Sequence, residues 1–326
     1  MKKDSLVSIL VVNWNGKEFI QKCLESLEGQ SYKNFEIILV DNASTDNSID
    51  IIEKNFPNVN LIKNNENVGF AEGNNIGIKK SKGEIICLFN PDAVADKNWL
   101  SIMVNSLQSS EKIGAATGKL FYLGDKFGKD KVFCTWSKVN TFSANTYNFH
   151  DDEPISKVDY LSGAAMVVKK SVIDKIGLMD KDYFLYFDET DWCARMIRAG
   201  YELLYVPTAI AWHAVSGLVS DSNKKIYYIK RSRVRFALKN FDGMFIPIFC
   251  IIFLTESFFV FLRDIKNRNF SRTTIRLRVI GWNISNIFHT KQSRKRDFSL
   301  IKKNSKFYSY NNSLPLKNIK TGGDMS

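Results

Sequence analysis

Hydrophobic and polar positions follow a repeating pattern over the first 120 residues. Short apolar runs rich in Val, Ile and Leu are separated by amphipathic stretches of roughly 10 to 20 residues, which is typical of β-α-β units. Such units form a mainly parallel sheet covered by helices on both faces, so the pattern predicts an α/β fold. The predicted strands are Leu6 to Asn13, Phe35 to Val40, Val59 to Ile62, Glu84 to Phe89 and Ile113 to Leu120.

The pattern is less regular after residue 120. Residues 124–157 combine Gly, Lys, Asp and Asn with scattered aromatic residues, which predicts an irregular insertion or hairpin and a candidate lid. Beyond it, the periodicity predicts two strands and two helices. These are a strand from Tyr160 to Val168, a helix from Ser171 to Ile176, a helix from Asp188 to Ala199, and a strand from Tyr201 to Val206 that ends at Pro207.

A 19-residue apolar run, Met244 to Leu262, approaches the ~20 residues that a membrane-spanning helix needs. The run contains Glu256, and a carboxylate inside a span costs roughly 2.5 to 3.5 kcal/mol. Basic residues flank both ends, so we favour a helix that lies in the membrane surface or re-enters it. A second aromatic and basic segment, Ile275 to Phe288, fits the same headgroup surface. The alternative is a helical subdomain packed on the rest of the chain with a solvated basic face.

The formal net charge of +12 is unevenly distributed. Residues 1–223 hold 24 Lys+Arg and 29 Asp+Glu, which gives a net charge of −5. Residues 224–326 hold 22 Lys+Arg and 5 Asp+Glu, which gives a net charge of +17. An acidic body with a basic end favours attachment to an anionic membrane surface, and no nucleic-acid recognition motif occurs in the body. The predicted organisation is a domain over 1–223 with halves of about 1–120 and 121–223, a helical membrane-associating region over 224–290, and a disordered polar tail over 291–326.

The five cysteines are spread along the chain without a CxxC pair. This excludes the usual spacing of a disulfide framework or a zinc site and favours a reducing compartment, the cytoplasm. The apolar run from Leu6 to Val12 resembles a signal peptide, but Asn13-Trp14-Asn15-Gly16 follows where a small-residue cleavage site would lie. We therefore interpret that run as a buried strand.

Asn or Asp residues follow each of the first four predicted strands. Ligands of parallel α/β sheets bind beyond the carboxyl ends of the strands, so these side chains predict a polar ligand pocket. Any one of them alone fits a helix cap or a turn equally well. The segments are Asn13 to Asn15, Asp41 to Asn42, Asn64 to Asn67, and Asn90 to Asp92.

The densest acidic cluster is Asp188-Glu189-Thr190-Asp191, which follows an aromatic run and opens a predicted helix. A single carboxylate there would be only a cap. Three within four residues repel one another, which points to a raised pKa or a bound cation. Burial beside the aromatic residues would raise the pKa of Glu189 and make it a candidate general base.

Asp92 follows a buried strand on a turn stiffened by Pro91. A divalent ion bound to a diphosphate needs only one or two protein carboxylates, and Asp92 suits that task. His213 follows an apolar stretch after another strand and is a candidate for the same ion, with a core or hydrogen-bonding role as the alternative. The glycines Gly69, Gly73 and Gly77 recur every four residues but form no GxGxxG motif, which argues against a nicotinamide dehydrogenase. No P-loop motif occurs, which argues against a P-loop kinase.

Six ordered motifs over about residues 5–215 resemble the family 2 glycosyltransferases, in particular their rhamnosyltransferase-like branch. They are VSILVVNWNG (7–16), ILVDNASTDNS (38–48), NENVGFAEGNNIGI (65–78), LFNPDA (88–93), LSGAAMVVKKSV (161–172), and YFDETDWCARMIRAGY (186–201) with AWH (211–213). The resemblance implies a GT-A fold, in which a Rossmann-like nucleotide-binding half joins an acceptor-binding half. It also implies transfer of a sugar from a nucleotide diphosphate with inversion at the anomeric carbon.

The resemblance assigns roles to individual positions. Asp41 would bind the nucleobase, with Asn13 and Asn15 beside the nucleotide. Asn67, Gly69 and Asn74 would lie near the ribose or diphosphate. In the family's DXD metal motif this chain has Asn90-Pro91-Asp92, so only the last carboxylate is present. Glu189 stands at the position of the catalytic base, with Asp188 before it and Asp191 orienting the site, and His213 matches a metal or diphosphate contact.

These roles imply a set of partners. They are a divalent cation (Mg²⁺ or Mn²⁺), a nucleotide-diphosphate sugar, and a glycan or lipid-linked glycan acceptor. The family branch implies deoxythymidine-diphosphate rhamnose as the donor. The enzyme would associate peripherally with the inner face of the cell membrane, and no nucleic acid is expected. The alternative function is a non-catalytic sugar-nucleotide or glycan-binding module of the same fold.

Overall fold

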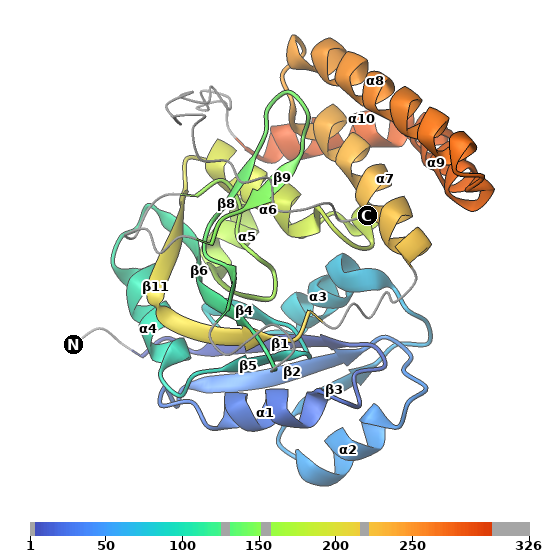
Figure 1. Cartoon of the computed structure of the whole chain (residues 1–326). Coiled ribbons are helices and arrows are strands. Elements are labelled where there is room, and N and C mark those ends of the chain that lie inside the picture. Colours follow the sequence, from blue (N-terminus) through green and yellow to red (C-terminus); the bar gives the residue numbers. More distant parts are fainter. Residues whose placement is uncertain (1–3, 125–130, 151–157, 216–221, 302–326) are drawn as a thin grey trace.

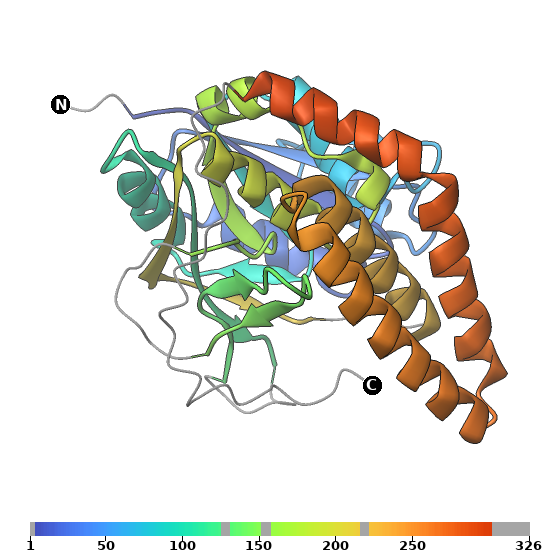
Figure 2. The same ribbon diagram turned by 90° about the horizontal axis from the view of Figure 1, so that it is seen from above.

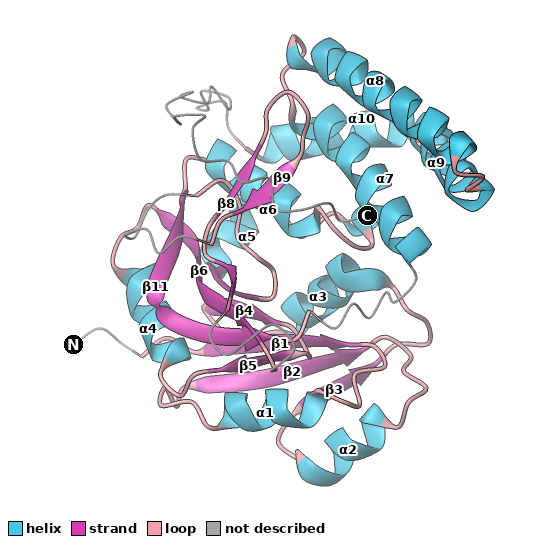
Figure 3. Cartoon of the chain, in the orientation of Figure 1, coloured by secondary structure: helices cyan, strands magenta, loops and turns pink. Residues whose placement is uncertain are grey.

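The structure is a computed structural model that describes residues 4–124, 131–150, 158–215 and 222–301. A nine-stranded sheet forms its centre, in the order β3-β2-β1-β4-β10-β6-β11-β5, and β7 pairs with β6 (Figure 3). The strands of this sheet are β1 Val7–Asn13, β2 Phe35–Asp41, β3 Asn60–Lys63, β4 Ile85–Phe89, β5 Ala93–Ala95, β6 Ile113–Tyr122, β7 Val132–Cys134, β10 Ala165–Lys169 and β11 Glu202–His213.

The predicted α/β fold is confirmed, and the five predicted strands of the first 120 residues are present. Strands β3, β2, β1 and β4 are parallel, as the β-α-β pattern predicts. The second half of the sheet is mixed, because β10 runs antiparallel between β4 and β6, and β5 and β7 are also antiparallel to their neighbours. The sheet is therefore parallel from β3 to β4 and mixed beyond β4.

Helices cover both faces of the sheet (Figure 1). In β1, alternate side chains enter different cores: Val7, Ile9 and Val11 pack with α1 (Ile20–Glu28), α2 (Ser48–Asn55) and α4 (Trp99–Gln108), whereas Leu10 enters the other core. That second core includes α3 (Gly69–Lys80), α5 (Lys170–Ile176) and α6 (Asp188–Arg198). The near-continuous apolar strands of the sequence thus reflect a sheet buried on both faces.

Strand β11 continues through Pro207 to His213, so the predicted end of this strand at Pro207 is wrong. The register against β6 shifts between Val206 and Ile210, and a proline without an N–H fits such an irregularity. Beyond the shift, β11 pairs with β5, and His213 lies opposite Ala93. The extension carries His213 to the carboxyl edge of β4, beside Asp92.

The strand predicted from Tyr160 begins only at Ala165, and Tyr160 itself forms an isolated bridge with Ser137. The predicted insertion contains β7 and a two-stranded hairpin of β8 (Ser137–Val139) and β9 (Thr146–Asn148). Residues 125–130 and 151–157 of that insertion lie outside the described residues, and its function as a lid stays a prediction.

Four helices form the C-terminal region: α7 (Ser222–Asn240), α8 (Phe245–Lys266), α9 (Phe270–Ser285) and α10 (Ile287–Leu300). Both views show α8 and α9 paired away from the sheet, with α10 nearer to it (Figures 1 and 2). The expectation of a disordered tail from Lys291 is wrong as far as Leu300, because α10 occupies these residues and packs on α7 and α5. The rest of the predicted tail, residues 302–326, lies outside the described residues.

Candidate active site

Glu189 lies in the first turn of α6, directly after a strained aromatic segment. Phe184, Tyr186 and Phe187 all have left-handed backbone conformations, with φ of 61°, 63° and 66°. Non-glycine residues pay for this conformation, and such strain collects at functional sites. The chain turns in this segment, so that α6 begins with Asp188 and Glu189 beside Gly163.

The electrostatics of this turn fit a general base. Burial raises the pKa of Glu189 well above its usual value, and the neighbouring Asp188 carboxyl raises it further. Burial also raises the pKa of Asp188, whose Oδ1 accepts a hydrogen bond from the Glu189 backbone N–H at 3.1 Å. Both shifts have the cause expected from the sequence, since carboxylates share a poorly hydrated helix start.

Asp191 occupies a different environment, two residues further along α6. Its carboxylate is fully buried and pairs with Arg195 Nε at 3.0 Å and Lys239 Nζ at 2.9 Å, and it accepts a hydrogen bond from Asn240 at 2.8 Å. Burial opposes its ionisation, but Lys239 and Arg195 outweigh burial and hold the pKa of Asp191 below its usual value. Asp191 therefore ties α6 to α7, and an orienting role in catalysis stays a prediction.

Asp92 and His213 meet at the carboxyl edge of the sheet. His213 Nε2 lies 3.0 Å from Asp92 Oδ1 and 3.2 Å from Asn90 Nδ2. The backbone N–H of Ala214 donates to the Asp92 carbonyl at 2.9 Å and fixes the two strand ends together. The sequence-predicted metal residues are thus neighbours, and the pairing of β11 with β5 brings them together.

The donor set suits a hard divalent cation that also binds phosphate oxygens. Asp92 Oδ1 and His213 Nε2 lie 3.0 Å apart, and a carboxylate oxygen and an imidazole nitrogen are both groups that would hold a divalent cation. The Asn90 Oδ1 atom is buried and has no hydrogen-bond partner within the described residues. The described residues contain no group of three or more His, Cys, Asp or Glu side chains placed to hold a metal ion, so a diphosphate and water would have to complete the shell.

The segment Gly163–Ala164 connects the two acidic positions. The Asn90 backbone N–H donates to the Ala164 carbonyl at 2.9 Å, so the turn that carries Asp92 is fixed to this segment. A Cβ placed on Gly163 would lie 3.3 Å from the Phe70 ring and 3.6 Å from Glu189 Cβ. Glu189 and the Asp92 turn therefore flank the same short stretch at the start of β10.

The predicted nucleotide-binding residues gather at the ends of β1 and β2. Asn13 and Asp41 are register partners, and Asn13 Nδ2 donates to Asp41 Oδ1 at 2.9 Å. The Asp41 carboxylate also accepts from the Ser44 hydroxyl at 2.6 Å and the Ser44 N–H at 2.9 Å. Asn15 Oδ1 accepts from the Thr45 N–H at 2.8 Å, so the two loops hold each other. Sequence reasoning missed Ser44, although Asp side chains commonly accept hydrogen bonds from backbone N–H groups a few residues further along the chain.

Asn67 and Gly69 link this half to the aromatic segment before α6. Asn67 Oδ1 accepts from the Gly69 N–H at 2.9 Å, and the Phe70 N–H donates to the Phe184 carbonyl at 2.8 Å. Gly69 has φ +85°, and a Cβ there would lie 2.5 Å from the Phe184 carbonyl oxygen. Asn74, by contrast, is buried inside α3 and donates to the Phe70 carbonyl at 3.0 Å, so it supports the helix start.

Comparisons with known proteins show the family of this chain. A profile of the family described as "Glycosyl transferase family 2" matches residues 8–177, just over half of the chain. The chain belongs to this family. It is 24% identical over 241 residues to the probable glycosyltransferase YdaM of Bacillus subtilis, which covers 72% of this chain and 55% of that protein. The chain therefore spans about half the length of this relative.

Solved structures show the same fold at low identity. The crystal structure of GalNAc-T7 with UDP, GalNAc and Mn²⁺ superposes with a TM-score of 0.60 at 14% identity, over 74% of this chain and 49% of that one. The mannosyltransferase PcManGT of Pyrobaculum calidifontis, in complex with GDP-Man and Mn²⁺, gives a TM-score of 0.55 at 16% identity, over 92% of this chain and 86% of that one. The family 2 chain thus has the GT-A fold implied by the motif resemblance.

Proposed function

We propose that this chain is an inverting glycosyltransferase that moves a sugar from a nucleotide diphosphate to an acceptor hydroxyl. The observation that carries the proposal is the arrangement of Glu189, with its raised pKa, and the Asp92–His213 pair on either side of Gly163–Ala164. An alcohol with a pKa far above 7 needs a base as it attacks, and a departing diphosphate needs charge compensation. The two acidic positions meet these two needs.

Each residue then has a distinct task. Glu189 takes the acceptor proton as the hydroxyl attacks the anomeric carbon from the face opposite the leaving group, which inverts that centre. Asp92 and His213 would hold Mg²⁺ or Mn²⁺, which supplies positive charge to the diphosphate when bound. Asn13, Asn15 and Asp41 form the nucleoside end, and Asn67 with Gly69 shapes the loop between the donor and the aromatic segment.

Rhamnose is the proposed donor sugar, supported by the ordered motifs of the rhamnosyltransferase-like branch. The neighbouring structures carry UDP or GDP-Man with Mn²⁺, which supports a nucleotide-diphosphate donor and a divalent cation for the present chain. The acceptor is proposed to be a lipid-linked glycan used in cell-surface polysaccharide synthesis.

Docking on the inner face of the cell membrane is supported by α8, which is long and apolar enough to cross a bilayer and is almost entirely unburied. Its exposed apolar side chains include Ile251, Leu254 and Phe259, at 66%, 60% and 65% exposure. A span is disfavoured because α9 packs along α8 and would have to cross the bilayer with it, whereas α9 has only 16 residues and contains Arg272, Arg276 and Arg278. Both helices therefore lie in the membrane surface in this proposal.

Thermal unfolding with a panel of nucleotide-diphosphate sugars tests the proposal, because a ligand of the native state raises the melting temperature. We expect stabilisation by one donor in the presence of Mn²⁺, release of the nucleoside diphosphate when acceptor is added, and weaker stabilisation in Asp92→Asn. The buried Cys87, in the middle of β4, offers the control Cys87→Ser, which should leave the selectivity among donors unchanged. Stabilisation by a donor without any sugar transfer would instead favour the non-catalytic binding module.

A further inference from the structure

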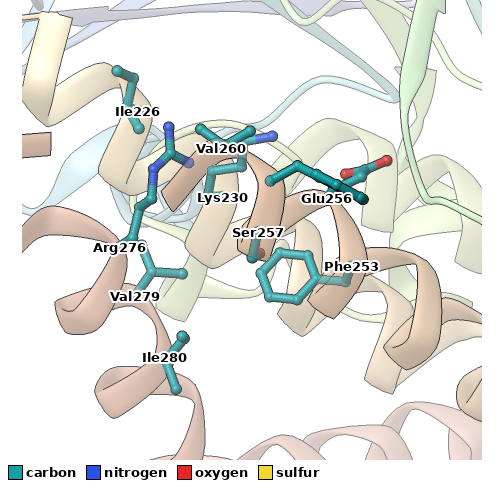
Figure 4. A pocket seen from close by; sticks show the side chains of 10 residues that line it. Ile226, Lys230, Phe253, Glu256, Ser257, Val260, Arg276, Val279 and Ile280 are labelled. Atoms are coloured by element: carbon teal, nitrogen blue, oxygen red, sulfur yellow. The ribbon is translucent and has the colours of Figure 1, made fainter. Parts of the chain in front are cut away.

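A cavity of ≈ 360 Å³ lies between α7, α8 and α9, away from the candidate active site (Figure 4). Most of its lining is apolar and includes Phe253 from α8 and Val279 and Ile280 from α9. Two cationic side chains also line it, Lys230 from α7 and Arg276 from α9. Figure 4 shows the nitrogen-bearing ends of Lys230 and Arg276 toward one side of the cavity, with the apolar side chains Phe253 and Ile280 away from them.

The charges around this cavity do not balance. Arg276 pairs with Asp264 at 2.8 Å, and Glu256 pairs with Arg233 at 2.8 Å. Within the described residues, the Lys230 ammonium has no ion-pair or hydrogen-bond partner. Burial lowers the pKa of Lys230, and Arg233 and Arg276 lower it further against the opposing effect of Glu256. Lys230 is therefore a partly buried positive charge that no carboxylate of the described residues contacts, although the Glu256 carboxylate also lines the cavity, and an anionic ligand would stabilise it.

The cavity is continuous with the apolar surface that we propose to lie in the membrane. Its lining residue Phe259 is 65% exposed, and Phe258 beside it is 57% exposed. On α9, Leu277 and Ile284 are 61% and 66% exposed near the lining residues Val279 and Ile280. A molecule that enters from the bilayer can therefore place an apolar chain in the cavity without crossing water.

We propose that this cavity binds one anionic phospholipid, with its phosphodiester against Lys230 and Arg276 and its acyl chain against Phe253, Val279 and Ile280. A phosphodiester carries one negative charge, which matches the one unpaired cation, whereas a diphosphate would bring an excess of negative charge. A zwitterionic lipid would add a second cation beside Lys230 and is disfavoured for that reason. The proposal rests on the proposed membrane docking and adds a specific lipid to it.

The position of the cavity connects it to the active site through one helix. Tyr228, on α7 between the lining residues Ile226 and Lys230, stacks on Phe184 with ring centroids 5.0 Å apart. Phe184 accepts the backbone hydrogen bond of Phe70 beside Gly69. A bound lipid would thus hold α7 between the membrane and the strained aromatic segment that precedes Glu189.

Titration of the full chain with monomeric dihexanoyl phosphatidylglycerol, followed by calorimetry, tests the proposal without a bilayer. We expect one site per chain and at least tenfold weaker binding of dihexanoyl phosphatidylcholine. Lys230→Gln should weaken phosphatidylglycerol binding by about tenfold or more, because a charge-assisted contact in an apolar site is lost. Lys224→Gln removes the same charge from an exposed position of α7 outside the lining and should leave the affinity unchanged.

Ser257→Leu provides a second variant, because it fills the cavity and leaves every charge in place. It should also remove the site, while flotation with phosphatidylglycerol vesicles should persist in all three variants. Equal affinity for the two lipids, or unchanged affinity in both Lys230→Gln and Ser257→Leu, would overturn the lipid site. Failure of the wild-type chain to float with vesicles, with the soluble-lipid site intact, would instead contradict only the membrane docking.

Discussion

Replacing Lys239 by Met probes the ionic cluster that joins the C-terminal helices to α6. The Lys239 ammonium is 1% exposed and lies 2.7 Å from Asp180, 2.9 Å from Asp191 and 2.7 Å from Asp297. Removing one partner of a buried ion pair typically costs 3 to 5 kcal/mol. We expect about 3 kcal/mol, the lower end, because arginines still face all three carboxylates: Arg235 at Asp180, Arg195 at Asp191 and Arg296 at Asp297.

The loss should depend on pH in a defined direction. Burial opposes ionisation of Asp180, but Lys239 and Arg235 outweigh burial and hold its pKa far below the usual value; Asp191 is likewise depressed. A depressed carboxyl pKa gives stability that is present above the unfolded-state pKa of about 4 and is lost as pH falls through the folded-state value. Without Lys239 these carboxyls regain higher pKa values and can take up a proton. The deficit of Lys239→Met should therefore be larger at pH 7.5 than at pH 5.

Urea unfolding of both proteins at the two pH values measures this difference. The matched control is Lys63→Met, because Lys63 pairs with Glu53 at 2.6 Å while both side chains are about half exposed. Exposed pairs typically contribute about 0 to 1 kcal/mol, so this control should stay close to wild type. A deficit below about 1 kcal/mol for Lys239→Met at pH 7.5, or one that grows toward pH 5, would refute the reasoning.

Two further predictions concern the active site. Gly69→Ala should destabilise the chain by about 1 to 3 kcal/mol and weaken donor binding, because its Cβ would meet the Phe184 carbonyl. The control is Gly124→Ala, since Gly124 has φ +100° but no neighbour within 4 Å. It should destabilise the chain less in the same urea titration. Equal losses in the two variants would contradict the steric argument. Asp188→Asn should move the acidic limb of the pH–rate profile to lower pH, because the Asp188 charge contributes to the raised pKa of Glu189. An unmoved limb would separate that limb from the Asp188–Glu189 pair.

Strands β1 to β4 could be predicted because their side-chain pattern is local. Runs such as Phe35–Asp41 are apolar on both faces and end in a polar residue, and both properties are visible in a few consecutive residues. Asp92 and Glu189 could be named as candidates for the same reason, since each follows a recognisable apolar or aromatic run. The contact between the His213 and Asp92 side chains could not be derived from the sequence pattern, because β11 continues past Pro207 only through pairing with strands far away in sequence.

The basic residues of α7 show what the local sequence could not predict, namely which charges are buried. Their clustering before an apolar run is typical of a membrane-flanking segment, yet Arg231, Arg233, Arg235 and Lys239 are all buried. Arg235 pairs with Asp180 and Asp182, more than 50 residues earlier in the chain, and Lys239 pairs with Asp191. The composition of a segment gives its charge, but it does not show which carboxylates from distant parts of the sequence neutralise that charge. Part of the +17 of the C-terminal third is therefore neutralised inside the fold.

The most direct test of the central claim is the kinetics of Glu189→Gln, which keeps the shape of the side chain and removes its basicity. General-base catalysis contributes typically 10² to 10⁴-fold, so the account predicts a fall in kcat of about that size with the donor Kd within about twofold of wild type. Asp92→Asn, measured beside it, should weaken donor binding. A Glu189→Gln enzyme with kcat within about threefold of wild type, or with donor binding lost, would contradict the assignment of Glu189 as the base.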